Sequence, residues 1–176
     1  QRVAQLASRL GCNAILINDV EERQSPYPLH NIVWTDKRTI YRDADLLSLH
    51  VPLTRSTRNM IGAHELALMK STAYLINTAR GGIVNEVALA EALTSGQIAG
   101  AAVDVFEREP YEGPFTALQN CLLTSHMGSM SNDCRVRMEV EATEDAIRFI
   151  QGDELLRPVP EDEFLTQLEE RGKSSC

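Results

Sequence analysis

Residues 73–126 hold three short apolar runs, AYLIN at 73–77, IAGAAV at 98–103 and CLL at 121–123, each followed by polar residues. Nearly continuous apolar runs of this length are typical of parallel strands that are covered on both faces. We therefore expect an α/β fold built on a doubly wound parallel sheet. Because parallel strands point the same way, the residues that follow them should collect along one edge, where open α/β sheets bind their ligands.

Three kinds of chemistry should meet at that edge of the sheet. The first run leads into Thr78-Ala79-Arg80-Gly81-Gly82, the second into Asp104 and Glu109, and the third into His126. A guanidinium, carboxylates and an imidazole next to one another can bind an anionic substrate and transfer a proton. The sequence therefore predicts a candidate catalytic site at the carboxyl ends of these strands.

The rest of the chain continues the alternation of strands and helices. Further apolar runs predict strands at 14–17, 32–34 and 46–51, the last stopped by Pro52. Apolar residues at helical spacing predict helices over 1–10 (ended by Gly11), 63–70, from Asn85 to Gly96, and 132–151. The first helix is already under way at residue 1 with neither a starting Met nor an N-cap residue, so we expect the chain to be truncated at its N-terminus.

Composition narrows the classes of partner. The chain has 25 acidic and 17 basic residues and a net charge of -8, which argues against a nucleic-acid partner. The chain shows no signal peptide and no apolar run long enough to span a membrane. Its four widely spaced cysteines indicate neither a zinc site nor a disulfide framework, so we expect no metal and a soluble, cytoplasmic protein.

Five motifs in order along the chain resemble one enzyme family. They are NTARGG at 77–82, VNE at 84–86, ALAEAL at 88–93, AAVDVFEREP at 101–110 and SHMGS at 125–129. Together they resemble the D-isomer-specific 2-hydroxyacid dehydrogenases, most closely the phosphoglycerate dehydrogenase group. The resemblance implies a Rossmann-type NAD-binding domain over 1–152 and, over 153–176, a tail that returns to a separate substrate domain. It also implies an enzyme that is commonly a homodimer.

The resemblance implies a role for each candidate catalytic residue. Arg80 matches the arginine that binds the substrate carboxylate, Glu109 the acid that partners the histidine, and His126 the general acid and base. A planar guanidinium can bind a 2-oxo acid through two hydrogen bonds. A neutral imidazole can accept the hydroxyl proton as a hydride leaves C2, and an adjacent carboxylate orients the ring and stabilises its protonated form.

The resemblance also implies a set of cofactor-binding positions. Asp19, at the end of a strand, matches the acid that binds a ribose hydroxyl, and Asp104 matches the acid near the nicotinamide carboxamide. The other positions that line the dinucleotide in the family are His50, Val51, Pro52, Thr57, Thr78, Ala79, Arg80, His126 and Gly128. A 2′-phosphate would meet Asp19, Glu21 and Glu22, so repulsion favours NAD over NADP, although Arg23 opposes this.

One part of the family pattern is absent from the chain. No G-x-G-x-x-G motif occurs, and residues 1–4 look like the helix that follows that loop in the family. We therefore expect a sheet that lacks its first strand and glycine-rich loop, and a chain that lacks most of the substrate domain. In the order 3-2-1-4-5-6 the missing strand is central, so its loss leaves a gap of ~10 Å and should prevent a stable monomer.

Other interpretations of these residues remain open at this point. Each candidate has an ordinary structural role available: Arg80 as a solvated turn cation, Glu109 as one loop acid beside Glu107 and Glu112, and His126 as a structural hydrogen-bonding residue. The main hypothesis is an NAD-dependent oxidoreductase acting on the CH-OH group of a small D-2-hydroxy acid. The alternatives are an NAD-binding corepressor-like interaction protein and a catalytically inactive fragment.

Overall fold

The computed structural model describes residues 2–20, 31–159, 161, 163 and 165. The predicted repulsion of a 2′-phosphate rests partly on Glu21, Glu22 and Arg23, which lie outside the described residues. Most of the predicted tail after residue 159 lies outside them as well.

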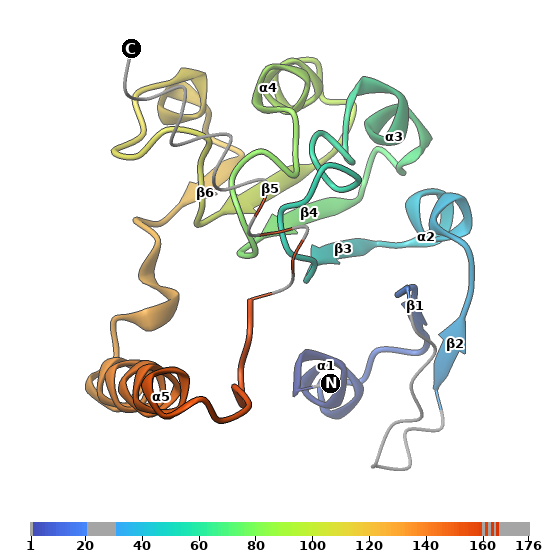
Figure 1. The fold of residues 1–176 in the computed structure, drawn as a ribbon. Helices are drawn as coiled ribbons and strands as arrows, with labels where there is room; N and C mark the ends of the chain where they lie inside the picture. Colours follow the sequence, from blue (N-terminus) through green and yellow to red (C-terminus); the bar gives the residue numbers. More distant parts are fainter. Residues whose placement is uncertain (1, 21–30, 160, 162, 164, 166–176) are drawn as a thin grey trace.

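A four-stranded parallel sheet forms the centre of the molecule (Figure 1). Its strands are β3 (Leu46–Leu49), β4 (Tyr74–Asn77), β5 (Gly100–Val103) and β6 (Cys121–Leu123), and they pair in chain order. Every pair is parallel and in register, so the first residue of β3 aligns with the first of β4 and the first of β4 with the first of β5. The four carboxyl ends therefore reach the same edge, as the sequence predicts.

A second, two-stranded parallel sheet lies beside the first one. It consists of β1 (Ile15–Ile17) and β2 (Ile32–Trp34). In the described part of the chain no strand joins β1 to β3, so the two sheets are separate. The predicted gap in the sheet order is thus present, and it falls between β1 and β3 as expected.

One face of the four-stranded sheet is covered by helices (Figure 1). These are α3 (Ala63–Leu68), α4 (Glu86–Thr94) and the short 3-10 helix η1 (Pro114–Ala117). Asn85 caps α4 by accepting a hydrogen bond from the Ala88 N–H. The largest fully buried side chains lie in this layer and on the strands beneath it: Ile61, Leu66, Leu75, Ile83, Leu89, Ile98 and Phe115. This layer is the hydrophobic core that holds the loops at the sheet edge.

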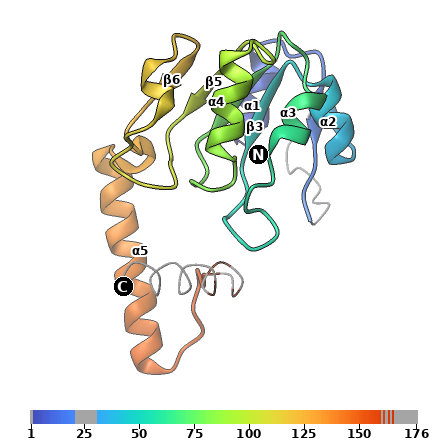
Figure 2. The same cartoon turned by 90° about the horizontal axis from the view of Figure 1, so that it is seen from above.

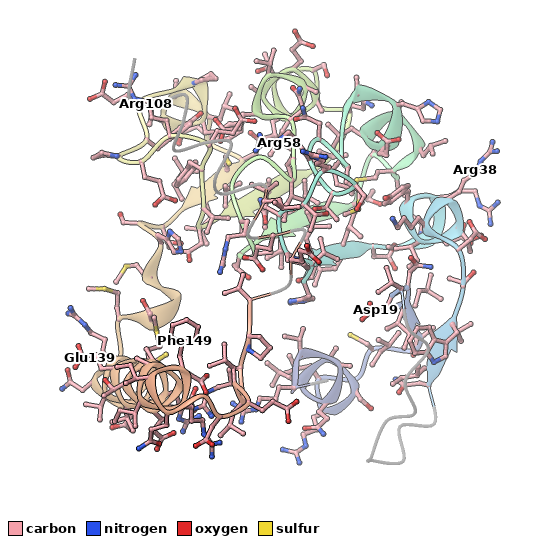
Figure 3. The ribbon with its side chains drawn as sticks, viewed as in Figure 1. Asp19, Arg38, Arg58, Arg108, Glu139 and Phe149 are labelled. Carbon is pink, nitrogen blue, oxygen red and sulfur yellow. The ribbon has the colours of Figure 1, made fainter. Side chains whose placement is uncertain are left out.

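The opposite face of the sheet is open at several positions. Leu46, Tyr74 and Leu122 point to it and are more than half exposed. The helices on this side are α1 (Arg2–Arg9) and α5 (Asn132–Gln151), and neither contains a buried residue. Figure 2 shows α5 extending away from the sheets. Phe149 on α5, labelled in Figure 3, is 75% exposed.

Element boundaries differ from the predicted ones at several ends. The predicted strand over 46–51 ends at Leu49, and the strand over 98–103 starts at Gly100. The helix predicted over 63–70 ends at Leu68, because Met69 adopts an extended backbone and its N–H bonds back to the Leu66 carbonyl. Gly11, Gly96 and Gly152 have positive φ at the ends of helices, where the sequence places helix ends.

The helix α2 (Lys37–Asp43) is not predicted from the sequence. Its N-cap is Asp36, which accepts hydrogen bonds from the N–H and the hydroxyl of Thr39. Only one large residue of this helix, Tyr41, is buried, so the helix carries no apolar repeat that a periodicity search could find. The 3-10 helix η2 (Met127–Ser129) was missed for the same reason. No helix in the described residues is long and apolar enough to cross a membrane.

Candidate active site

Four loops meet at the carboxyl edge of the four-stranded sheet. Residues 50–58 follow β3, residues 78–82 follow β4, residues 104–110 follow β5, and residues 124–129 follow β6. All but one of the predicted site residues lie in these loops, and the exception, Asp19, follows β1. The parallel register thus gathers residues that are up to 78 positions apart in the chain, from His50 to Gly128.

Asn77 shapes the loop that carries Arg80. It is the last residue of β4 and only 2% exposed, and its amide nitrogen donates to the Arg80 carbonyl at 3.0 Å. Its amide oxygen accepts from the Ala79 N–H at 3.2 Å. The Arg80 guanidinium is exposed and donates to the Ala79 carbonyl at 2.7 Å. The backbone is therefore held while the cation stays accessible to an anion.

Gly81 lets the Arg80 loop touch the loop that carries Glu109. A Cβ atom added at Gly81 would lie 2.0 Å from the Phe106 carbonyl oxygen and 2.7 Å from the Glu107 nitrogen. Contacts this short are impossible for a side chain, so the two backbones are packed directly against each other. The glycine after Arg80 is needed for this close approach and not for a positive φ.

Glu109 and His126 form a hydrogen-bonded pair. The Nδ1 atom of His126 lies 2.9 Å from Oε2 and 3.2 Å from Oε1 of Glu109. Oε1 also accepts from the Phe106 N–H at 3.1 Å, so the carboxylate is oriented from two sides. The side chains of His126 and Glu109 are 48% and 38% exposed, which leaves Nε2 accessible to a substrate. Of the acids in this loop, the structure brings Glu109, not Glu107 or Glu112, to the imidazole.

Asp104 holds the backbone around His126. The His126 N–H donates to the Asp104 carbonyl at 2.8 Å, and the Met127 N–H donates to the Asp104 carboxylate at 2.9 Å. The Thr124 hydroxyl also donates to that carboxylate. His126 has φ 52° and ψ 54°, a left-handed conformation that is unfavourable for a residue other than glycine. These three hydrogen bonds help to hold it there.

Hydrogen bonds keep both carboxylates charged. Burial by itself would raise the pKa of Asp104, but the Thr124 hydroxyl, the Met127 N–H and the nearby His126 outweigh it and lower that pKa. The pKa of Glu109 is lowered in the same way, because the hydrogen bonds from His126 and the Phe106 N–H outweigh the effect of burial. An ionised Glu109 accepts from the Nδ1–H of His126 and leaves the lone pair of Nε2 free.

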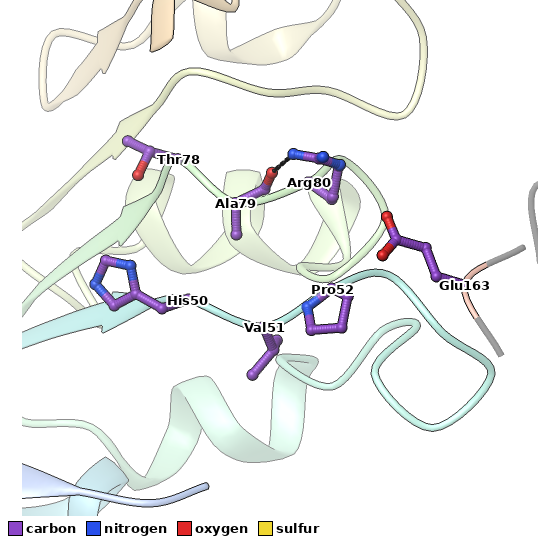
Figure 4. A pocket seen from close by; sticks show the side chains of 7 residues that line it. All are labelled: His50, Val51, Pro52, Thr78, Ala79, Arg80 and Glu163. Atoms are coloured by element: carbon purple, nitrogen blue, oxygen red, sulfur yellow. Dashed lines mark hydrogen bonds between the residues drawn. The ribbon is translucent and has the colours of Figure 1, made fainter. Parts of the chain in front are cut away.

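A cavity of about 280 Å³ opens between the loops after β3 and β4 (Figure 4). Its lining combines apolar and polar groups of both loops with one residue from the segment after α5: His50, Val51, Pro52, Thr78, Ala79, Arg80 and Glu163. The His50 imidazole contacts the Ser48 hydroxyl at 2.9 Å, and partial burial lowers the pKa of His50, which favours its neutral form. Six of these seven residues are predicted site residues.

Thr57 and Gly128 occupy different positions from the residues of the cavity. The Thr57 hydroxyl donates to the Pro52 carbonyl at 2.6 Å and accepts from the Thr54 N–H at 2.7 Å. Thr57 therefore shapes the loop that presents Pro52 to the cavity. Gly128 lies in η2 on the His126 side, in open space.

Asp19 lies apart, at the end of β1 on the two-stranded sheet (Figure 3). It is exposed, and one carboxylate oxygen accepts from the N–H of Val20 at 2.7 Å. The other oxygen has no protein donor among the described residues, so it is available to a hydroxyl group.

Three residues of the site were not predicted. Thr124 binds Asp104, Glu163 lines the cavity, and Glu86 accepts a hydrogen bond from the Glu107 N–H at 2.7 Å. Glu86 is the first residue of α4, where an acidic residue is expected for helix stability alone. Nothing in the local sequence separates such an acid from one that reaches another loop.

The comparison with protein families identifies this domain. A model of the NAD-binding domain of the D-isomer-specific 2-hydroxyacid dehydrogenases matches residues 1–128, which is well over half of the chain. The chain belongs to the D-isomer-specific 2-hydroxyacid dehydrogenase family. The predicted family and the predicted Rossmann-type fold are thus confirmed, and NAD is the cofactor of this domain type.

The named relatives of this dehydrogenase domain include two kinds of enzyme. It is 41% identical over 153 residues to a glyoxylate reductase of Aeropyrum pernix, covering 86% of this chain and 45% of that protein. It is 34% identical over 154 residues to a D-3-phosphoglycerate dehydrogenase of Methanocaldococcus jannaschii, covering 87% of this chain and 29% of that protein. The chain therefore spans less than half the length of these relatives.

Solved structures of the family agree with the fold. A D-lactate dehydrogenase with NAD⁺ from Lactobacillus jensenii superposes with a TM-score of 0.76 at 31% identity, covering 90% of this chain and 52% of that one. A D-lactate dehydrogenase from Aquifex aeolicus, complexed with NAD and lactic acid, gives 0.75 at 29% identity, covering 86% of this chain and 50% of that one.

The residues at the sheet edge fit a nicotinamide dinucleotide. The apolar walls at Val51, Pro52 and Ala79 suit a flat ring, and the free carboxylate oxygen of Asp19 suits a ribose hydroxyl. In the described residues, no group of three or more His, Cys, Asp or Glu side chains could hold a metal ion.

Proposed function

We propose that the protein containing this domain oxidises a small D-2-hydroxy acid with NAD and reduces the corresponding 2-oxo acid in the reverse direction. The observation that carries this proposal is the hydrogen-bonded pair of Glu109 and His126, held at the same sheet edge as an accessible Arg80. A proton-transfer group, its orienting carboxylate and a carboxylate-binding cation are the three groups that this reaction asks of a protein.

In the oxidation, His126 acts as the general base. Its Nδ1–H donates to Glu109, so Nε2 accepts the proton of the substrate hydroxyl as the C2 hydride leaves for the nicotinamide ring. The negative charge of Glu109 stabilises the imidazolium that forms. NAD supplies the hydride acceptor when it is bound.

In the reduction, the same groups act in the opposite sense. The imidazolium of His126 donates its Nε2 proton to the substrate oxygen as a hydride arrives at C2. Arg80 binds the substrate carboxylate through two hydrogen bonds in both directions, which fixes C2 relative to His126. Because the Arg80 backbone is held by Asn77 and by the close contact at Gly81, this cation is placed by the packed part of the fold.

The cofactor would be held along the edge by residues from several loops. We assign the ribose hydroxyl to Asp19 and the nicotinamide end to the segment around Asp104 and Gly128. The flat faces of the dinucleotide would contact the cavity walls between the β3 and β4 loops, with His50 and Thr78 as polar neighbours and Thr57 shaping the wall.

The wider assignment is part of the same proposal. Residues 1–152 form part of the NAD-binding domain, and residues 153–176 lead back toward the substrate domain. The protein is a cytoplasmic homodimer. It belongs to the phosphoglycerate dehydrogenase group of the family, and its substrate is a small acid of the kind that this group uses. The Arg80 cation can bind the carboxylate of any small 2-oxo acid, so the preferred substrate has to be measured.

The test is a panel of 2-oxo acids offered with NADH to the complete protein. Glyoxylate, hydroxypyruvate, its 3-phosphate and pyruvate vary the group on C2 while keeping the carboxylate and the oxo group. We expect oxidation of NADH with at least one of them, and highest kcat/KM for the phosphorylated acid. His126→Asn, measured in parallel, controls for contaminating dehydrogenases.

The outcomes of this panel separate the hypotheses. A protein that binds NADH but turns over none of the acids would contradict the proposal and favour an NAD-binding interaction protein. A preference for glyoxylate over the phosphorylated acid would retain the reaction and replace the substrate assignment.

A further inference from the structure

We propose that Glu86 is a positioning residue for the Glu109–His126 pair: it holds the loop after β5 in the conformation that presents Glu109 to the imidazole. This inference rests on the proposed dehydrogenase reaction and adds a residue to it. Glu86 lies on α4, outside the four loops at the sheet edge, and it acts through Glu109 without touching substrate.

The first observation is the hydrogen bond itself. Oε1 of Glu86 accepts from the backbone N–H of Glu107 at 2.7 Å, across 21 residues of sequence. In the part of the chain that the structure describes, this N–H is the hydrogen-bond donor to the Glu86 carboxylate. Because the side chain is half-buried, burial raises the pKa of Glu86, and the Glu107 N–H works against that rise.

The second observation is that two adjacent N–H groups of one loop bind two different carboxylates. The Phe106 N–H donates to Glu109, and the next N–H, that of Glu107, donates to Glu86. The orientation of these two peptide groups therefore determines where the Glu109 carboxylate lies. If Glu86 releases the second N–H, the first one loses its fixed direction.

The third observation is the contact on the carbonyl side of the same residue. The Phe106 carbonyl lies against Gly81, where a Cβ atom would be 2.0 Å from its oxygen. Glu86 and Gly81 belong to one segment, which runs from the end of β4 into α4. This segment thus holds the Phe106–Glu107 peptide from both sides and links the position of Glu109 to that of Arg80.

The groups around Glu86 call for an acceptor oxygen at the reach of a glutamate side chain and not for a negative charge. The charge of Glu107 raises the pKa of Glu86, and the charge of Glu86 raises the pKa of Tyr111, so neither of these neighbours supplies a positive charge to Glu86. Tyr111 stacks between Phe106 and Phe115, so the apolar side of this region is already closed. A shorter side chain or an alanine at residue 86 would leave the Glu107 N–H without its acceptor.

The test uses three substitutions of Glu86 in the complete protein. Glu86→Gln keeps an acceptor oxygen at the same reach, Glu86→Asp keeps the charge at the helix N-terminus but shortens the side chain, and Glu86→Ala removes both. We expect Ala and Asp to lower kcat about tenfold with unchanged NAD affinity, and Gln to stay within about twofold of the parent. Glu91→Ala, on the exposed side of α4, is the matched control.

The pH profile separates a positioning role from a structural one. With Glu109 less well placed, the imidazolium is less stabilised, so the reduction profile of Ala and Asp should move toward lower pH, as in Glu109→Gln. We expect the Glu86→Asp and Glu86→Gln variants to have similar melting temperatures. Equal kcat and equal profiles for all three variants, or a Gln variant as impaired as Ala, would overturn the proposal.

A second readout does not depend on turnover. The ¹⁵N NMR chemical shifts of the His126 ring report which nitrogen carries the proton. A Glu109 carboxylate that is hydrogen-bonded to the ring favours the Nδ1–H form. We expect that form to be less populated in Glu86→Ala and Glu86→Asp and restored in Glu86→Gln. If the parent shows no turnover, the proposed function fails while the ring shifts still decide the role of Glu86. If turnover is present and the shifts do not change, the positioning role fails alone.

Discussion

The four-stranded and the two-stranded sheets of this molecule are built alike but packed very differently. Every fully buried side chain of the described residues lies between Ile61 and Phe115, in the four-stranded sheet and its helices. The strands β1 and β2 and the helix α1 have no buried residue, and the strand edges between β1 and β3 are unpaired. A two-stranded sheet alone is marginal in water.

This difference coincides with a division of the candidate site. Arg80, Glu109 and His126 all stand on the packed sheet, where neighbouring loops hold them within hydrogen-bond distance of fixed partners. Asp19, the proposed ribose ligand, stands on the sparsely packed sheet. We infer that the core positions the proposed proton-transfer groups, whereas the position of the proposed ribose ligand depends on what packs beside β1.

The largest expected effect is on stability and compares the same substitution in the two sheets. Leu75→Ala on β4 should cost about 3 kcal/mol of unfolding free energy, because Leu75 is fully buried and its loss leaves a cavity. Leu16→Ala on β1 should cost about 1 kcal/mol, because Leu16 is already partly exposed. Urea unfolding of both variants, made in the complete protein, checks this. Equal costs would mean that β1 is as well packed as β4.

Amide hydrogen exchange sharpens the same comparison in the unmodified chain. The N–H groups of β4 and β5 should exchange more slowly than those of β1 and β2, since the latter open without disturbing the core. The sequence-based expectation that this chain is no stable monomer stays a prediction. It requires that the chain bind a hydrophobic dye and melt without a sharp transition, and a cooperative melt of a monomer would contradict it.

The next largest effect is on turnover, and it comes from a residue on the four-stranded sheet. Replacing His126 with Asn should lower kcat by about 10²-fold or more while NAD affinity stays nearly unchanged, because proton transfer is lost and the cofactor contacts remain. Steady-state kinetics and NAD titration measure the two quantities. A loss of NAD affinity as large as the loss of kcat would show that His126 supports binding and not chemistry.

Low pH should lower the stability of the fold, because protonation of Asp104 removes the carboxylate that holds the loop around His126. The folded pKa of Asp104 is below its ordinary value of 3.8, so its ionised form stabilises the fold above that value, and the contribution is lost as pH falls through the lower folded pKa. Asp104→Asn should therefore be less stable at pH 7 and lose less on acidification. Urea midpoints between pH 7 and pH 2 check this, and parallel curves for parent and variant would contradict it.

Glu109→Gln should shift the pH profile of the reduction and lower the activity only moderately. The amide can still accept from the imidazole, but the negative charge that stabilises the imidazolium is gone. The reduction, which needs protonated His126, should then lose activity at lower pH than in the parent. A profile that stays in place or moves upward would favour Glu107 or Glu112 as the functional acid, against the observed geometry.

The smallest effect belongs to the sparsely packed sheet. Asp19→Asn should weaken NAD binding about fivefold with little change in kcat, because a single exposed hydrogen bond to a ribose hydroxyl is lost. The discrimination against NADP should fall as well, since a negative charge is removed. An unchanged NAD dissociation constant would show that Asp19 does not reach the ribose, and calorimetry can measure it.

The sequence by itself was sufficient for the fold class and for the residue types of the site. The buried strands are apolar almost throughout, and the caps at Asn85, Gly96 and Gly152 use residues with a strong local preference, so both are visible without tertiary contacts. The motifs around Arg80, Glu109 and His126 were sufficient to predict the family. The missed helix α2 has one buried residue and carries no such signal.

The tertiary structure alone decided which of these residues come into contact. Of the three candidate acids Glu107, Glu109 and Glu112, only folding shows that Glu109 reaches His126, because the choice depends on where the peptide groups of Phe106 and Glu107 point. The left-handed conformation of His126 and the link from Glu86 to that loop likewise arise between segments about 20 residues apart. Local patterns report the preferences of single segments, whereas these contacts exist only after the parallel strands have brought their ends to one edge.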